Sequence, residues 1–245
     1  MPSSPPSQAG PADPRLIINE ILDFWFALPY AAWFGAPSPA FPTPESLDAE
    51  LRGRFLVAMG EARAGRLDDT WTRTPRGALA LLLLLDQFPR NVHRGSGEAF
   101  ATDARAVEVA VRALARGFDR AFGRAEADGG RGEEAGAVAG GGGEGEGVSD
   151  TISSSLVPRV FFYLPLCHAE DLTAQIAATA LSENLLKACP DASPERPFLE
   201  RSVGFFQMHR DVIFKLGRFP ARNKALGRES TQEEVEFLRE RPEGL

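Results

Sequence analysis

Three stretches of this sequence open with a capping residue followed by proline, and this feature constrains the fold most. Asp13-Pro14, Thr43-Pro44 and Thr74-Pro75 each precede a run in which most apolar residues recur at helical spacing or fill the whole run. Aspartate and threonine suit the N-cap of a helix, and proline suits its first position, where an N–H would have no helical partner. Each stretch is therefore predicted to begin a helix.

Helical spacing continues along the chain, and no segment alternates convincingly at the period of a strand. Further helices are predicted at 104–116, 157–164, 169–188 and 198–216, with a last one after the capping box at 230–234. Pro29, Pro89 and Pro165 are expected to stop helices, because proline cannot continue one. We therefore expect an all-α fold of seven or eight helices arranged as antiparallel helical pairs.

Length and composition predict one domain. A chain of 245 residues with 43% hydrophobic content can bury one sizeable core and does not require two. Residues 1–12 contain four prolines among small polar residues and are expected to form a disordered tail. Ten of the nineteen residues in 129–147 are glycine, so this stretch cannot offset its ordering entropy. The prediction is a single helical domain over 13–245, interrupted by a flexible insertion at 125–152.

Charge and cysteine content exclude several classes of protein. The formal net charge is −7, but residues 126–150 contain seven acids and one base, so the rest of the chain is nearly neutral. We expect no nucleic-acid partner, since such proteins present a strongly basic face. The longest apolar run, 78–85, is too short to span a membrane. Cys167 and Cys189 have neither metal-finger nor disulfide spacing, and we expect a cytoplasmic protein without a metal or cofactor.

Two distant segments share Phe-Pro followed by Arg-Asn, at 88–91 and 219–223. Both are predicted to turn the chain at a helix end and to present an arginine at a defined place. Arginine binds carboxylate or phosphate through two parallel hydrogen bonds, so converging arginines would form an anion pocket. The alternative is that each arginine ties a loop to helix-end carbonyls or to a nearby carboxylate. The candidate ligand-binding residues are Arg90, Asn91, Arg218, Arg222 and Asn223.

Histidines supply the candidate acid–base chemistry. His209 lies four residues after Phe205 and four before Ile213 on an apolar stripe, so its ring is predicted to face inward. A buried histidine needs a hydrogen-bond partner, and beside a carboxylate it can act as a general base. The alternative is that His209 is a satisfied core histidine and that His168 caps the helix it begins. The candidate catalytic residues are His168, Glu170, His209 and Asp86.

Four motifs occur in order along the chain, at 21–26, 84–91, 162–165 and 216–220. With them, the chain from about Pro14 to Leu238 resembles the DUF924 family, apart from the glycine-rich insertion. The resemblance implies an all-helical fold similar to that of tetratricopeptide-repeat proteins and brings no established activity. Three positions depart from the family pattern. Ala169 stands where the family has serine, Ala221 stands where it has histidine, and His93 stands where it has tyrosine.

Two functions are compatible with these residues. In the first, a soluble helical protein binds a small anionic ligand in the arginine pocket, with hydrolytic chemistry carried by His168 or His209 and oriented by Glu170 or Asp86. In the second, a tetratricopeptide-like module holds a protein or peptide on a concave face and has no catalytic activity. The helices show no regular 34-residue period, which counts against the second. Fold analogy alone cannot choose between them.

Overall fold

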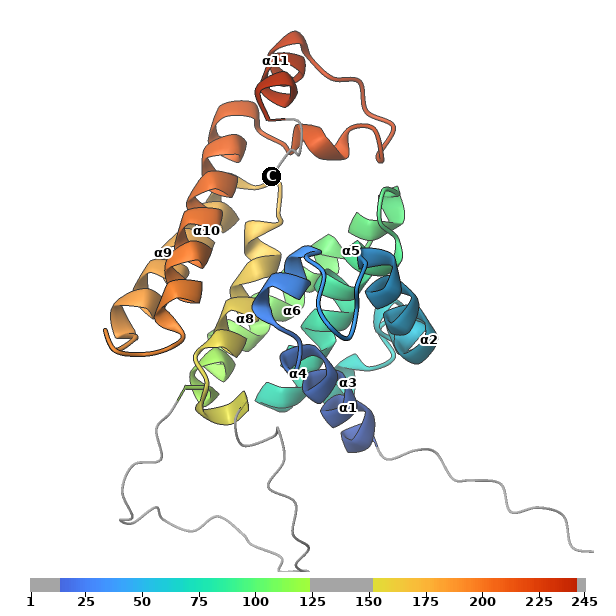
Figure 1. Ribbon diagram of the computed structural model, residues 1–245, viewed down its shortest axis with the longest axis vertical. Helices are drawn as coiled ribbons and strands as arrows, with labels where there is room; N and C mark the ends of the chain where they lie inside the picture. Colours follow the sequence, from blue (N-terminus) through green and yellow to red (C-terminus); the bar gives the residue numbers. More distant parts are fainter. Residues whose placement is uncertain (1–13, 124–151, 242–245) are drawn as a thin grey trace, which may run out of the picture.

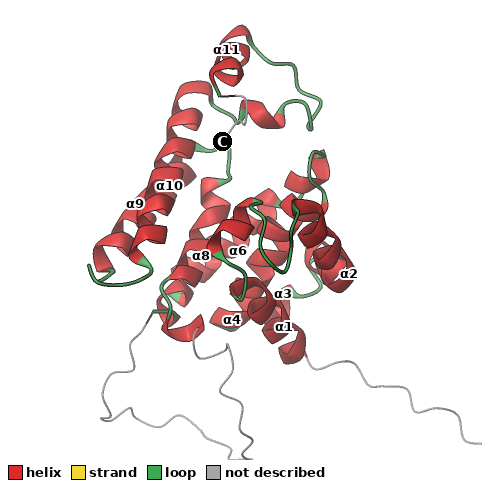
Figure 2. Ribbon diagram, viewed as in Figure 1, coloured by secondary structure: helices red, strands yellow, loops and turns green. Residues whose placement is uncertain are grey.

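The computed structural model describes residues 14–123 and 152–241, and every regular element in these ranges is helical (Figures 1 and 2). The all-α prediction is confirmed, and the likeness to tetratricopeptide repeats stays a prediction. The predicted tail at 1–12 and the insertion at 125–151 lie outside the described residues. Ile152, predicted as the insertion's last residue, is instead buried in the core.

The N-terminal part contains six α-helices, and two of them, α2 and α4, begin at the caps that the sequence predicts. The Thr43 hydroxyl accepts a hydrogen bond from the Ser46 N–H, and the Thr74 hydroxyl accepts one from Gly77. The short α3 and the separation of α5 from α4 raise the number of helices above the seven or eight predicted. The six helices are α1 (Pro14–Phe26), α2 (Pro44–Arg63), α3 (Asp68–Trp71), α4 (Pro75–Leu82), α5 (Phe88–Val92) and α6 (Asp103–Ala115).

Four more α-helices form the C-terminal part: α8 (Val157–Cys167), α9 (Leu172–Ala188), α10 (Arg196–Leu216) and α11 (Gln232–Glu240). Helix α8 packs against α4 and α6 on one side and against α9 and α10 on the other (Figure 1). Helices α9 and α10 lie side by side as an antiparallel pair. Helix α9 starts three residues later than predicted, because the Asp171 carboxylate accepts the N–H of Ala174 at 2.7 Å and caps it.

The first Phe-Pro segment does not end a helix, which corrects the prediction. After α4 the chain continues through a π-helical turn, Leu83–Gln87, directly into α5. Pro89 cannot donate to the carbonyl of Leu85, and that oxygen instead accepts from the Thr102 hydroxyl at 2.5 Å. The π-helical turn and this hydroxyl allow the helical path to pass the proline. Asp86 and Arg90 therefore lie one turn apart on a buried helix.

Pro165 also fails to stop its helix, since α8 runs on to Cys167. Every residue from Val160 to Cys167 is buried, so packing outweighs the loss of one helical hydrogen bond. His168 then ends α8 and does not begin the next helix. The alternative in which His168 caps the helix it begins is therefore wrong.

The second Phe-Pro segment turns the chain as predicted. Helix α10 ends at Leu216, and Gly217 adopts a left-handed conformation with φ of 73°. Pro220 then opens a short 3-10 helix, Pro220–Arg222. Residues 217–240, here called the C-terminal segment, pack on the body through a small apolar cluster that includes Ile213, Phe219 and Phe237. No helix within the described ranges is long and apolar enough to cross a membrane.

Candidate functional site

A pocket of about 690 Å³ lies where α5, the end of α8, α10 and the C-terminal segment meet. Its walls are mainly aromatic: Trp33, Phe34, Phe100, Phe198, Phe205, Phe206, Phe219 and Phe237. Its charged and titratable lining residues are all basic: Arg90, Arg94, Arg201, Arg222, His168 and His209. A mostly apolar cavity of this volume with a few polar groups has the character of a small-molecule site.

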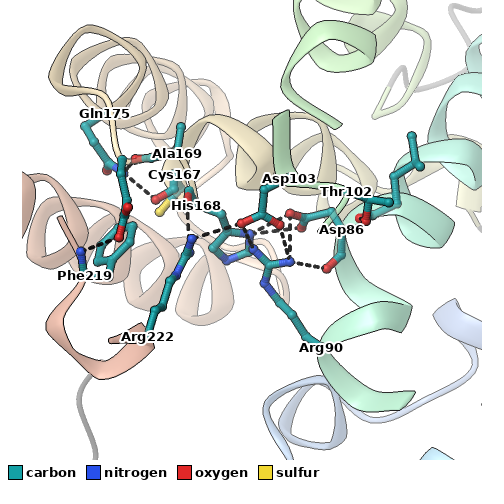
Figure 3. Close-up of polar contacts among 12 residues, drawn as sticks. Asp86, Arg90, Thr102, Asp103, Cys167, His168, Ala169, Gln175, Phe219 and Arg222 are labelled. Atoms are coloured by element: carbon teal, nitrogen blue, oxygen red, sulfur yellow. Dashed lines mark hydrogen bonds and ion pairs between the residues drawn. The ribbon is translucent and has the colours of Figure 1, made fainter. Parts of the chain in front are cut away.

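His168, which lines the pocket, forms a buried pair with Asp86, which does not line it (Figure 3). The Nδ1 atom of His168 lies 2.9 and 3.0 Å from the two carboxylate oxygens of Asp86. The Gln87 side chain donates a further hydrogen bond of 2.5 Å to this carboxylate. Burial raises the pKa of Asp86, but the Arg90 charge and these hydrogen bonds outweigh burial and hold it below its usual value. Asp86 is therefore ionised and can orient the His168 ring.

Asp103 joins two of the three predicted ligand-binding arginines, Arg90 and Arg222 (Figure 3). It accepts two hydrogen bonds of 3.0 Å from Arg90 and one of 3.0 Å from Arg222. Asp103 is the first residue of α6, and this helix has no side-chain capping hydrogen bond. This carboxylate therefore draws Arg90 and Arg222 together, although 131 positions separate them in the sequence.

Arg222 is fixed on several sides. Its guanidinium lies 4.7 Å from the ring centre of Phe100 and 4.5 Å from that of Phe219. It also donates to the backbone carbonyl of His168 at 2.9 Å. These cation–π contacts hold the planar group in the pocket wall. Asn91 reaches the same wall, where its side chain bonds the Gln87 carbonyl and the Arg94 guanidinium.

His209 faces inward, as its position on the apolar stripe predicts. It is 6% exposed, and its ring centre lies 6.1 Å from that of His168. Its Nδ1 atom lies 2.9 Å from the backbone carbonyl oxygen of Phe205. Burial lowers the pKa of His209 to about 3, so the ring is neutral at ordinary pH.

Glu170, Arg218 and Asn223 are not brought into the pocket. Glu170 accepts from Arg228 at 2.6 and 2.9 Å and from the Phe219 N–H at 2.8 Å. Arg218 pairs with Glu234, and the Asn223 amide donates to Glu234 at 3.1 Å. All three side chains stabilise the C-terminal segment. For Arg218 this agrees with the alternative stated above, in which an arginine ties a loop to a nearby carboxylate.

No group of three histidine, cysteine or acidic side chains within the described ranges is arranged to hold a metal ion. Cys167 precedes His168 but is fully buried, and burial raises the pKa of its thiol well above the usual value. A protonated, buried thiol is a poor nucleophile.

The unpredicted residues of the site include Asp103 and Arg201. Arg201 lies on the face of α10 that carries Phe198, Phe205 and His209, at spacings of three and four residues. This spacing could have identified Arg201 from the sequence. Asp103 carries no such signal, because its partners come from two distant segments.

The Glu234 carboxylate makes the attachment of the C-terminal segment sensitive to acid. Hydrogen bonds from Arg218, Thr231 and Asn223 lower the pKa of Glu234 to about 2. Since the unfolded value is about 4.3, the carboxylate stabilises the fold above that pH and loses its contribution as the pH falls towards 2. Glu234→Gln is expected to flatten the decline in unfolding free energy between pH 4.5 and 2.5.

Urea unfolding at a series of pH values measures this effect. The matched control is Glu236→Gln on the same helix, because Glu236 is exposed and bonds only Gln232 among the described residues. Equal slopes in the two variants would contradict the assignment to Glu234.

Comparisons with known proteins agree with the motifs and the fold. The family model DUF924, described as a bacterial protein of unknown function, matches residues 21–242. No curated protein matches the chain. Among solved structures, a protein of unknown function from Agrobacterium tumefaciens, ATU0120, is 32% identical with a TM-score of 0.68, over 93% of this chain and 99% of that one. The chain therefore belongs to the DUF924 family.

Proposed function

We propose that the pocket binds a small organic anion. The observation that carries this proposal is the lining, which combines four arginines and two histidines with aromatic walls and includes no carboxylate side chain among the described residues. A concave site lined by one sign of charge attracts ligands of the opposite sign. Aromatic walls favour a ligand with a flat apolar body. The volume suits a molecule of drug or metabolite size.

Arg201 supplies the charge that the protein itself does not neutralise. Arg90 and Arg222 pair with Asp103, and Arg94 pairs with Asp48 at 3.0 Å. Arg201 is exposed and has no hydrogen bond or ion pair within the described part of the chain. A ligand carboxylate or phosphate at the pocket mouth would meet this free guanidinium first, and the paired arginines offer it only their remaining N–H groups.

The Asp86–His168 pair favours a second step, hydrolysis of a bound ester. Asp86 orients the ring through Nδ1, and Nε2 is then available to take a proton from water as the water oxygen attacks the ester carbonyl carbon. Collapse of the tetrahedral intermediate breaks the bond to the alcohol oxygen, which receives the proton back from Nε2. The products are a carboxylic acid and an alcohol, with no further reactant consumed.

The binding proposal is tested with the fluorescent aromatic anion 8-anilinonaphthalene-1-sulfonate, displaced by benzoate. Arg201→Gln is expected to weaken binding about fivefold, because it removes one charge-assisted contact at a partly exposed site. Arg112→Gln is the control, since it also removes one exposed positive charge but lies on α6, outside the pocket lining. Equal affinity in the two variants, or failure of benzoate to displace the probe, would contradict the proposal.

The interaction-module alternative stays a prediction. A peptide on a concave face would need no buried base and no free arginine at a pocket mouth. The aromatic lining and the Asp86–His168 pair support the small-ligand function over it.

A further inference from the structure

The hydrogen bonds of the two pocket histidines define their tautomers. A backbone carbonyl only accepts, so the Nδ1 atom of His209 must carry the hydrogen that it donates to Phe205. The ionised carboxylate of Asp86 likewise accepts from Nδ1 of His168. Burial lowers the pKa of both histidines, so both rings are neutral at ordinary pH. Each ring therefore carries a bare lone pair on Nε2.

These two Nε2 atoms are available to a ligand. Neither has a hydrogen-bond partner among the described residues, and neither is an atom enclosed by protein. Both residues are buried, at 8% and 6% exposed, and both rings line the pocket. Water can satisfy the lone pairs while the pocket is empty. A flat ligand that displaces this water leaves them unpaired unless it brings a donor.

The donor must be uncharged. An ammonium group would approach four guanidinium groups in the same pocket and would be repelled. A hydroxyl group donates to a neutral imidazole nitrogen without adding positive charge. The arginines meanwhile supply only donors and therefore require an acceptor such as a carboxylate. One ligand that meets both requirements carries a carboxylate and a hydroxyl on an aromatic ring.

We propose that this pocket selects aromatic hydroxy acids, with the ligand carboxylate against the arginines and the ligand hydroxyl donating to Nε2 of His168 or His209. This inference rests on the anion-binding function proposed above and adds the ligand class. A site built to pair a ligand hydroxyl discriminates strongly against the analogue that lacks it, because its own polar groups then stay unpaired.

The test is isothermal titration calorimetry of the full-length protein at pH 7.5. The probes are benzoate, the three hydroxybenzoates and the three methoxybenzoates. The best hydroxybenzoate is expected to bind at least about tenfold more tightly than benzoate and than its own methyl ether, which accepts but cannot donate. Hydroxybenzoates that bind within threefold of benzoate would overturn the ligand class and leave anion binding intact. No binding of any benzoate would overturn both proposals.

Two variants locate the acceptor. In His168→Asn and His209→Asn the amide nitrogen takes the place of Nδ1–H and can keep its hydrogen bond, whereas the Nε2 acceptor is lost. In at least one variant, the ratio of hydroxybenzoate affinity to benzoate affinity is expected to fall below threefold, while benzoate itself still binds. Benzoate affinity thus controls for any change in the shape of the pocket. Full preference retained in both variants would overturn the proposal.

Discussion

Asp86→Ala is expected to lower the free energy of unfolding by about 4 kcal/mol, which is the range for removing one partner of a buried charged pair. Asp86 is 1% exposed and has three partners: His168, Gln87 and Arg90. Its removal leaves the donors of His168 and Gln87 buried without this acceptor. Arg90 then keeps only one carboxylate partner, Asp103. The loss is measured by urea unfolding followed by circular dichroism.

Asp48→Ala is the matched control. Asp48 also pairs with an arginine and is nearly buried, but its partner Arg94 has a side chain that is 47% exposed. Solvent can take over the exposed guanidinium, so the loss is expected to stay near 1 kcal/mol. Similar losses in the two variants would contradict the assignment of a special stabilising role to the Asp86 cluster.

The milder Asp86→Asn tests the base role separately from stability. Asparagine is nearly isosteric but removes the charge that holds Nδ1–H of His168 in place. Hydrolysis of mono(4-nitrophenyl) succinate, an anionic aryl ester, is expected to fall at least about tenfold in this variant and in His168→Gln. Equal rates in wild type and both variants would contradict hydrolysis by this pair and would leave ligand binding untouched.

The starts of α2 and α4 and the end of α10 were predictable because their causes are local. Thr43 and Thr74 accept backbone hydrogens three residues ahead, and Gly217 adopts the left-handed conformation that glycine permits. These interactions involve residues that are neighbours in the sequence. A capping pattern therefore predicts a boundary without knowledge of the tertiary fold.

The two prolines inside helices were not predictable from local rules. Pro89 is accommodated because the Thr102 hydroxyl, thirteen residues away, bonds the carbonyl that the proline leaves free. Pro165 is accommodated because α8 is buried among four other helices. In both cases, contacts with residues outside the helix outweigh the local preference of proline to end a helix.

In the candidate site, too, some features follow from local sequence and others depend on the tertiary fold. The inward direction of His209 follows from helical spacing, and Asp86 was already considered as the group that orients a histidine. The choice of Asp86 over Glu170 depends on the fold, because Asp86 meets His168 from another helix and Glu170 is drawn away by Arg228. Spacing along one helix could not distinguish these two carboxylates.

Asp103→Ala is expected to lower the free energy of unfolding by about 3 kcal/mol and to loosen the C-terminal segment. Asp103 is the carboxylate shared by Arg90 and Arg222, and the three side chains are only 13 to 20% exposed. Without Asp103, the two partly buried guanidinium groups have fewer hydrogen-bond acceptors. Their mutual repulsion then adds to the free energy lost with the two ion pairs. Urea unfolding measures the first effect, and trypsin cleavage within 217–240 measures the second.

Glu98→Ala provides the control, because the Arg63–Glu98 pair has similar chemistry but side chains 55% and 52% exposed. Its loss is expected to stay below about 1 kcal/mol, with no change in cleavage at the C-terminal segment. The double variant Asp103→Ala with Arg222→Ala separates pairing from packing, since residues in one ion-pair network are non-additive. If the two losses simply add, the other contacts of Arg222, with Phe100, Phe219 and the His168 carbonyl, hold the segment, and the Asp103 bridge does not.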